Sequence, residues 1–422
     1  MMVSRPINSR VRDNDLNFVG AGGTMPRRDA PSLRILAIGP VSLEDMLNGA
    51  GVRAHNLLYR FRSSHEVHYV HFQSSMERKQ TGTSTGVVRD IPAQATLWSR
   101  IARWLRIGLP CDFSPAMERC VSQMVALRNF DVILTFEFAF LQYAVGRGLP
   151  IVADIIDEPI LSVQRDLAIV RDVGQRLRLK KHILELRLYL KRFCSQAHTC
   201  IVVGQEDSNS LHSIVPEANI EVIPNGVDAS YFAPASTSAE PFTILFSGNL
   251  GYEPNILAVH HFAERIFPIV QERCPQARWY IVGAHGPDYL RTWNSDHICV
   301  TGFVPDLRPY LAKTAVVISP LISGGGIKNK VLEAWAMRKP VVATSLGCSG
   351  IAAEDNKNVL IANDPTEFAH KTAQVLLDAS LADSIAAGGY RTALESYTWN
   401  RSAARLETIL YVAAGASPTV DT

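Results

Sequence analysis

Two successive series of short apolar runs, separated by helix-like stretches, constrain the fold of this chain more than any other feature. In the first series the runs occupy residues 33–39, 67–72, 131–136, 149–154, 199–203 and 220–224. In the second series they occupy residues 242–246, 277–282, 315–319 and 340–343. Buried parallel strands are nearly continuous apolar runs, and strands that alternate with helices form a parallel sheet covered by helices. The sequence therefore predicts an α/β protein with two doubly wound, Rossmann-like domains facing across a cleft.

The segment from Tyr231 to Pro241 is rich in proline, serine and alanine and has little periodicity, which predicts an interdomain linker. We accordingly expect the first domain over residues 33–235 and the second over 236–395. Residues 396–422 are expected to form a terminal helix followed by a tail. Residues 1–32 are polar and contain several arginines and glycines, so we expect a disordered tail there.

Charge and cysteine usage exclude several classes of protein. A net charge of +2 is too small for whole-protein electrostatics to indicate a nucleic-acid partner. The seven cysteines are scattered and include no Cys-x-x-Cys pair, which argues against a zinc site and a disulfide framework. That usage favours a reducing compartment. No apolar run reaches the roughly 18–20 residues that span a bilayer, so we expect a cytoplasmic protein that meets a membrane only at its inner surface.

The segment over residues 319–344 carries the most chemical information. An apolar run is followed by Gly324–Gly326, where the backbone can approach a ligand closely. Lys328 and Lys330 fall in the predicted first turn of the next helix, where unpaired N–H groups favour an anion. Glu333 lies on the same helical face as Lys330 and is placed to accept hydrogen bonds from a ribose diol. The pattern predicts a diphosphate site; the alternative is a glycine-rich turn with solvated lysines and a surface glutamate.

This segment resembles the donor-binding region of retaining glycosyltransferases of the GT-B fold, family 4 (glycosyl transferases group 1). Further stretches resemble the same family in the same order, and together they cover nearly everything from Leu33 to about Leu410. They are Val222–Asp228, Phe246–Asn255, Trp279–Gly283, Val300–Val304 and Tyr397–Leu410. The resemblance implies the GT-B fold, a second domain that binds a nucleotide-diphosphate sugar, and a terminal helix that crosses back to an acceptor-side first domain.

The resemblance also implies which residues bind the donor. Carried over onto this sequence, they are Gly248, Asn249, Asn255, Gly324, Gly325, Gly326, Ile327 and Glu333. The family usually has two glutamates separated by seven residues; Glu333 matches the second, but the first falls on Gly325. In the family that first glutamate is associated with the donor sugar, so its usual contact is missing here. Arginine is common at the position of Asn249, and we expect Lys328 and Lys330 to supply the missing positive charge to the phosphates.

The acceptor side offers fewer candidates. Gly49 and Gly51 stand in a loop that resembles the family's first glycine-rich loop, and His55 follows in the next turn. His55 is a candidate acceptor contact, with a partly buried helix histidine as its alternative. Asp157 ends an apolar run and is a candidate catalytic base or ligand of an acceptor hydroxyl. Its alternative role is to cap a helix or hold the loop.

We therefore expect a glycosyltransferase that moves a sugar from a nucleotide-diphosphate sugar to a glycan or lipid-linked acceptor. The expected catalytic residues are Asp157, Lys328 and Lys330, and the expected setting is bacterial-type polysaccharide or glycolipid synthesis. The resemblance implies retention at the anomeric carbon. No Asp-x-Asp pair stands in the donor loops, so neither a metal nor another cofactor is expected. The alternatives are a non-catalytic sugar-nucleotide-binding module and a GT-B sugar-nucleotide epimerase.

Two basic segments indicate a partner of another kind. Trp98–Arg106 has apolar residues at helical spacing with arginines on another face. The segment Arg165–Arg192 contains nine lysines and arginines against three acidic residues. Basic amphipathic helices can lie on anionic membranes. We expect an anionic membrane surface to contact these segments; the alternative is core helices with solvated charged faces.

Overall fold

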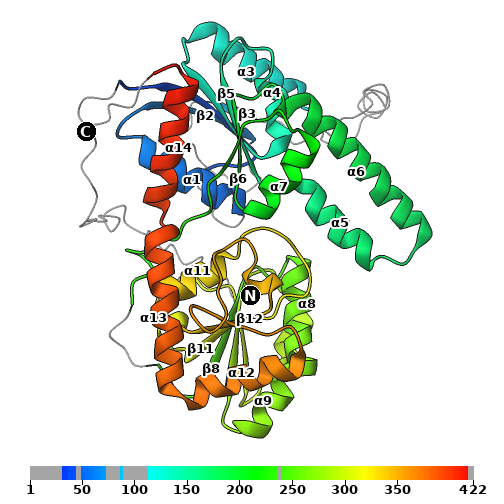
Figure 1. The fold of residues 1–422 in the computed structure, drawn as a ribbon, viewed down its shortest axis with the longest axis vertical. Helices are drawn as coiled ribbons and strands as arrows, with labels where there is room; N and C mark the ends of the chain where they lie inside the picture. Colours follow the sequence, from blue (N-terminus) through cyan, green and yellow to red (C-terminus); the bar gives the residue numbers. More distant parts are fainter. Residues whose placement is uncertain (1–30, 44–48, 73–85, 89–112, 235–238, 417–422) are drawn as a thin grey trace, which may run out of the picture.

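The computed structural model describes residues 31–43, 49–72, 86–88, 113–234 and 239–416. Within them, two parallel sheets stand one above the other, each covered by helices (Figure 1). The prediction of two doubly wound α/β domains is therefore confirmed. The expected N-terminal tail falls outside the described residues except for residues 31 and 32, and the segment Trp98–Arg106 lies wholly outside them.

The first sheet has seven strands in the order β3-β2-β1-β4-β5-β6-β7, all parallel to their neighbours. The strands are β1 (Arg34–Gly39), β2 (Glu66–Phe72), β3 (Gly86–Val88), β4 (Val132–Phe136), β5 (Ile151–Ile156), β6 (Thr199–Val202) and β7 (Ile220–Val222). The helices between them are α1 (Gly49–Phe61), α3 (Pro115–Leu127), η1 (Phe138–Phe140), α4 (Leu141–Ala144), α5 (Pro159–Ile169), α6 (Val173–Cys194) and α7 (Gln205–Ile214). Every residue of β4 and β5 is buried, which explains why these strands are unbroken apolar runs.

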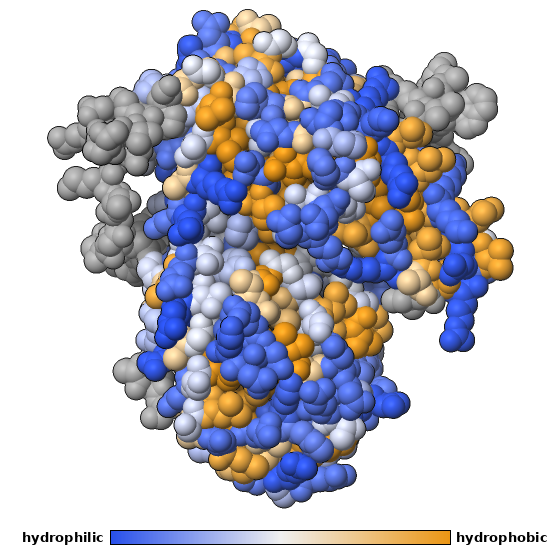
Figure 2. Space-filling view, viewed as in Figure 1, coloured by the Kyte–Doolittle hydropathy of each residue, from blue (hydrophilic) through white to orange (hydrophobic). Residues whose placement is uncertain are grey.

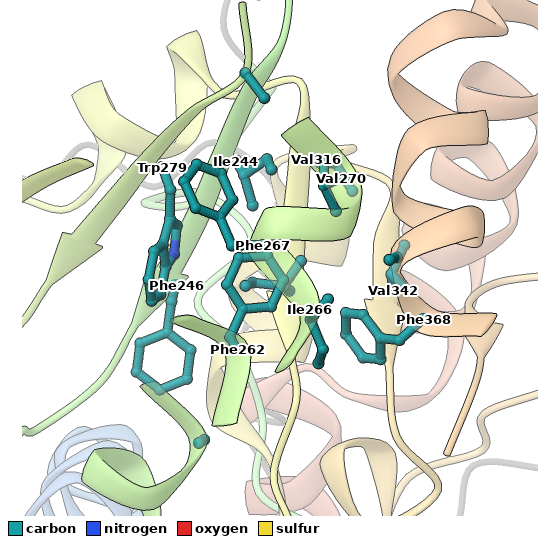
Figure 3. Packing of buried hydrophobic residues seen from close by; sticks show 14 of the residues in the cluster. Ile244, Phe246, Phe262, Ile266, Phe267, Val270, Trp279, Val316, Val342 and Phe368 are labelled. Atoms are coloured by element: carbon teal, nitrogen blue, oxygen red, sulfur yellow. The ribbon is translucent and has the colours of Figure 1, made fainter. Parts of the chain in front are cut away.

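The second sheet has six strands in the order β10-β9-β8-β11-β12-β13, again all parallel. The strands are β8 (Thr243–Ser247), β9 (Arg278–Val282), β10 (Ile298–Gly302), β11 (Val316–Ser319), β12 (Val341–Ala343) and β13 (Leu360–Ile361). The helices are α8 (Glu253–His261), η2 (Phe262–Ile266), α9 (Phe267–Arg273), η3 (Asp288–Trp293), α10 (Arg308–Lys313), α11 (Asn329–Ala336), η4 (Leu346–Cys348), α12 (Pro365–Leu377) and α13 (Ala379–Ser396). Figure 3 shows the aromatic centre of this domain, where Phe262 and Phe267 pack against the fully buried Trp279 and Phe368 packs against Phe262.

The helical segment between β8 and β9 is not uniform along its length. It begins at Glu253 and contains the π-helical turn η2 before α9. Pro268, in the first turn of α9, has no N–H to donate to the preceding turn. A local widening to the π-helical pattern accommodates such a missing bond without ending the helix.

The last helix, α14 (Trp399–Ala413), lies against the first domain although it follows α13 of the second (Figure 1). It packs on α1, and Trp399 is buried in the core below β1 and β4. The Ser402 hydroxyl donates to the Pro224 carbonyl at 2.9 Å, close to the point where the chain leaves the first domain. The two segments in which the chain passes between the domains, after Pro224 and before α14, thus lie side by side.

Candidate active site

The carboxyl ends of the two sheets face one another, and loops from both meet between them. Ile327, in the loop after β11, packs against Ala50, Ile156 and Val203 of the first domain. In doubly wound sheets ligands bind at these strand ends. The sequence-predicted residues fall into two groups there, one around Lys330 and one around Lys328.

Lys330 lies in the first turn of α11 and reaches the loop after β8. Its Nζ donates to Asn255 Oδ1 at 2.8 Å and lies 4.0 Å from the centre of the Phe246 ring. Asn255 in turn donates to the Asn249 carbonyl at 2.8 Å. A β-carbon added to Gly248 would stand 2.9 Å from the Asn255 amide nitrogen and 3.1 Å from Lys330 Nζ, so a side chain there would displace one of these two groups. The structure thus brings together Gly248, Asn249, Asn255 and Lys330 around one ammonium group.

Glu333 is one turn further along α11 and belongs to the same group. Burial raises the pKa of Glu333 to about 7, and the charge of Lys330 opposes that rise. Burial lowers the pKa of Lys330 to about 7, with a smaller contribution from the nearby Lys328 charge. The hydroxyls of Ser247 and Ser323, which precede the two glycine loops, are buried without a hydrogen-bond partner. This half of the site therefore holds a cation, a carboxyl and polar groups whose hydrogen-bonding capacity is not used within the protein.

Lys328 does not join this group. Its side chain is buried, and its Nζ donates to the carbonyls of Gly325 at 2.7 Å and Gly326 at 2.6 Å. Burial lowers the pKa of Lys328 to about 8, and the Asp157 charge partly offsets that shift. Lys328 is also the residue before α11, so it lies outside the helical turn in which it was expected, and the three glycines form a loop. The reason is the positive φ of Gly324 (95°) and Gly326 (69°), which a right-handed helix cannot contain.

Arg165, on α5 of the first domain, was not singled out in the sequence as a site residue. Its Nη1 donates to the Gly324 carbonyl at 3.1 Å, and its Nη2 pairs with the Glu206 carboxylate at 2.9 Å. A β-carbon on Gly325 would stand 3.0 Å from Arg165 Nη1. The guanidinium therefore occupies the direction in which a longer side chain at position 325 would project. No local pattern could have shown this, because the contact joins residues 159 positions apart.

Three consecutive carbonyls of the glycine loop consequently point at cations. Arg165 holds the carbonyl of Gly324, and Lys328 holds those of Gly325 and Gly326. In a planar trans peptide the N–H points away from the carbonyl, so the amides of Gly326 and Ile327 face away from these cations. The loop is therefore ordered, before any ligand binds, by one cation from each domain.

Asp157 lies directly against this loop. Its Oδ2 would be 2.6 Å from a β-carbon on Gly326, so the carboxylate touches the glycine backbone from across the cleft. The Asp157 side chain is exposed on one side. Burial of its other sides raises its pKa, and the charges of Lys328 and Arg53 oppose that rise. The cap of α5 is Glu158, whose carboxylate accepts from the amides of Ile160 and Leu161. The helix-capping alternative for Asp157 is therefore wrong.

A second carboxyl, Glu137, stands at the end of β4, next to the strand that ends at Ile156 before Asp157. Burial and the charge of Asp157 raise the pKa of Glu137 to about 7. Both Glu137 (φ 66°) and Ile156 (φ 70°) have left-handed backbone conformations that are uncommon for residues with a β-carbon. A lone glutamate after an apolar run gives no sequence signal, so its place in the cleft was not predicted.

The acceptor-side candidates are arranged differently from the expectation. Gly49 and Gly51 do not form a loop before the helix, since they make the first turn of α1. The distance from His55 Nδ1 to the Leu43 carbonyl oxygen is 2.7 Å. The His55 ring also stacks on Tyr59 of the same helix. The structure therefore gives His55 an internal partner and does not bring it to the glycine loop of the second domain.

Beneath Asp157, a buried ion pair joins α1 to β5. Arg53 Nε donates to Asp154 Oδ2 at 2.7 Å, and both side chains are fully buried. Arg53 also donates to Asn225 Oδ1 at 2.9 Å and to the Ile223 carbonyl at 3.0 Å. The pair thus ties α1, the end of β5 and the interdomain passage to one another.

We predict that Arg53→Met lowers the free energy of unfolding by about 3–5 kcal/mol, because it leaves the Asp154 carboxylate buried without its cation. Urea unfolding followed by circular dichroism measures the loss. The double variant Arg53→Met/Asp154→Leu removes both charges and should recover much of it. A single variant within about 1 kcal/mol of wild type would contradict the assignment.

The shifted pKa of Lys330 predicts a pH dependence of anion binding. Above pH 7 the free protein progressively loses the Lys330 proton, so binding an anionic diphosphate there requires proton uptake. We expect the affinity for a nucleoside diphosphate to fall as pH rises from about 7 to 9. Calorimetry in two buffers of different ionisation enthalpy measures the uptake. In Lys330→Arg the guanidinium stays charged and the slope should flatten; an unchanged slope would assign the titration to another group.

A cavity of about 380 Å³ opens beside Arg165 and Gly326, between the two domains. Its lining includes Arg165, Gly326, residues 203–207 and residues 349–352. Among the residues that the structure describes, no cluster of three or more histidine, cysteine or acidic side chains is arranged to hold a metal ion. In the same part of the chain, no helix combines the length and the apolar run needed to cross a bilayer.

Comparison with known proteins agrees with this architecture. Residues 47–231 match the family model described as Glycosyltransferase Family 4, and residues 241–378 match Glycosyl transferases group 1. One curated relative is the GDP-mannose-dependent alpha-(1-6)-phosphatidylinositol monomannoside mannosyltransferase of Mycobacterium tuberculosis, 26% identical over 221 residues. That match covers 46% of this chain and 56% of the relative. An uncharacterized 44.6 kDa protein in the cps region of Klebsiella pneumoniae is 24% identical over 163 residues, 36% of this chain and 42% of its own. The chain thus spans about half the length of the curated relatives it matches.

Solved structures share the fold at low sequence identity. Sucrose-phosphate synthase from Thermosynechococcus elongatus superposes with a TM-score of 0.65 at 14% identity, over 89% of this chain and 98% of that one. Anabaena HepE in complex with UDP and glucose gives a TM-score of 0.63 at 15% identity, over 90% and 99% of the two chains. These likenesses show the two-domain arrangement alone. Together with the two family models, they establish that the chain belongs to the family 4 (group 1) glycosyltransferases and has the GT-B fold.

Proposed function

We propose that this protein transfers a sugar from a nucleotide-diphosphate sugar to a glycan or lipid-linked acceptor, in polysaccharide or glycolipid synthesis. The observation that carries the proposal is the ammonium group of Lys330, held between Gly248 and Asn255 in the first turn of α11. A cation beside a helix N-terminus and a glycine that excludes side chains form a site for a diphosphate. The relatives act on GDP-mannose or were solved with UDP, according to their names, which supports a donor of this class.

The proposed roles follow from where each group lies. As the bond from the anomeric carbon to the phosphate breaks, negative charge develops on the leaving diphosphate. Lys330 and the amides of α11 stabilise that charge. Glu333, one turn further on, binds the ribose hydroxyls. The exposed ring of Phe303, at the end of β10 on the same edge of the sheet, offers a face on which the base can stack.

The acceptor is proposed to enter from the first domain, where Asp157 touches the glycine loop. Its carboxylate is placed to bind the acceptor hydroxyl, and the leaving diphosphate takes the proton in a transfer with retention. Gly49, Gly51 and His55 are given no part in this step, since the two glycines lie in the first turn of α1 and His55 contacts the Leu43 carbonyl. Lys328 acts through the loop that it holds, and we propose for it a positioning role in place of the expected contact with phosphate.

The test is a thermal-shift screen with uridine, guanosine, adenosine and thymidine diphosphates, followed by turnover of the sugar nucleotide whose base gives the largest shift. Binding to the folded state raises the melting temperature by mass action. We expect one base to be preferred and the matching sugar nucleotide to be slowly hydrolysed without acceptor. A shift without hydrolysis or transfer would support the alternative of a non-catalytic binding module. No shift with any nucleotide would contradict the proposal.

A further inference from the structure

The helix α6 carries a stripe of large apolar side chains that none of the described residues covers. Val173, Leu177, Leu184 and Leu188 are 78%, 69%, 58% and 46% exposed. With 100° between successive helical residues, the four fall within about 60° of one another around the axis. The opposite face of the helix is buried in the core of the first domain through Leu186, Tyr189, Leu190 and Phe193. The stripe is therefore a fixed outer surface of the folded protein.

Basic residues border this stripe on both sides. On one side stand Lys180, Arg187 and Lys191, and on the other Lys181, Arg192 and Arg178, all of them exposed. Glu185 is the one acidic residue within α6, and it already lies 3.6 Å from Lys181. Figure 2 shows hydrophobic and strongly hydrophilic residues next to one another on the arm that α5 and α6 form. An apolar centre with cationic borders matches the interface of a bilayer that contains anionic lipids.

The position of the arm relates this surface to the cleft. α5 begins two residues after Asp157, and its 11 residues lead outward before the chain returns along α6 (Figure 1). A helix of that length spans about 16 Å. The start of the stripe at Val173 therefore lies roughly one short helix from the residues where the two domains meet.

From these observations we propose that the outer face of α6 docks on the anionic surface of a lipid bilayer, with Val173, Leu177, Leu184 and Leu188 inserted at the headgroup level. A second copy of this chain fits the surface poorly, because two such helices would oppose their positive charges. The docking is independent of the transfer chemistry. It would hold the cleft near acceptors that are embedded in a membrane.

Vesicle co-sedimentation tests the proposal without any sugar nucleotide. Wild type should bind vesicles that contain phosphatidylglycerol and should bind pure phosphatidylcholine weakly. Lys180→Gln/Lys181→Gln/Arg187→Gln removes three charges and should weaken binding about 10²-fold, at roughly fivefold for each charge. Leu177→Gln/Leu184→Gln should weaken it about tenfold or more, since the side chains no longer enter the interface.

The matched control is Leu127→Gln/Leu377→Gln, which changes two leucines that are 80% and 61% exposed at the ends of α3 and α12. Its binding should equal that of wild type, and all variants should keep the melting temperature and its shift with nucleoside diphosphate. Equal binding by wild type and the α6 variants would overturn the proposal. So would dimerisation in the absence of vesicles that is lost in Leu177→Gln/Leu184→Gln, which would assign the stripe to a second copy. Neither result would affect the proposal of sugar transfer.

Discussion

Replacing Lys330 with alanine should weaken binding of the nucleotide-diphosphate sugar and slow its turnover by about 10²–10³-fold, the usual effect of removing one group that stabilises developing charge. The ammonium of Lys330 is preorganised by Asn255 and by the ring of Phe246, so it needs no rearrangement to meet a phosphate. Calorimetry with the nucleoside diphosphate and steady-state turnover measure the two parts of the effect. The loss should appear in both affinity and turnover.

Lys328→Ala is the informative comparison, because this lysine binds backbone carbonyls and not the Gly248 loop. We expect a smaller loss of diphosphate affinity and a lower melting temperature, since the loop loses the cation that orders two of its peptides. Equal affinity for the diphosphate in wild type and in both alanine variants would remove the lysines from the donor site. A larger affinity loss in Lys328→Ala than in Lys330→Ala would exchange their proposed roles.

Gly326→Ala should reduce turnover by about 10²-fold, the effect expected when reacting groups are displaced by about 1 Å. A β-carbon there would stand 2.6 Å from Asp157 Oδ2, so either the loop or the carboxylate must move. The residue also has a φ of 69°, a left-handed conformation that costs a residue with a β-carbon about 1–2 kcal/mol. Turnover at saturating donor reports the displacement, and urea unfolding reports the strain.

The neighbouring Gly325→Ala is the matched control. Its β-carbon would meet only Arg165 Nη1, at 3.0 Å, which is the far end of a flexible side chain, and its φ is not among the positive values. We expect turnover within about threefold of wild type, since the Arg165 side chain need move only by a few tenths of an ångström. Similar large losses in both variants would mean that the whole loop, and not the contact with Asp157, is sensitive.

The strands could be predicted because their signal is local. β4 and β5 are buried along their whole length, so the apolar runs that predicted them reflect their own burial. The start of α11 could not be predicted with the same success. Lys328 was expected in its first turn, yet two of the glycines before it have positive φ and the helix starts only at Asn329. Their conformation depends on cations that hold their carbonyls, and one of those cations comes from the other domain.

In the candidate site, too, residue types could be predicted from local sequence, while side-chain contacts could not. Gly248, Lys330 and Glu333 could be proposed for a diphosphate site from the sequence, since residue spacing and the family resemblance indicated them. The different orientations of the two lysines were not evident, because side-chain direction depends on which carbonyls and amides lie nearby. Glu137 and Arg165 were not recognised, since a single charged residue has the same local sequence whether it lies on the surface or in a cleft.

By itself, the sequence of this protein determined two α/β units and the family to which the chain belongs, and it predicted a donor site in the segment after β11. These depend on burial, periodicity and residue type, which act between near neighbours along the chain. Only the tertiary structure decided that Lys328 and Arg165 order the glycine loop, that Asp157 touches it and that no described residue covers the apolar stripe of α6. Each of these depends on surfaces that meet, or fail to meet, after folding, and residues far apart in sequence come together only then.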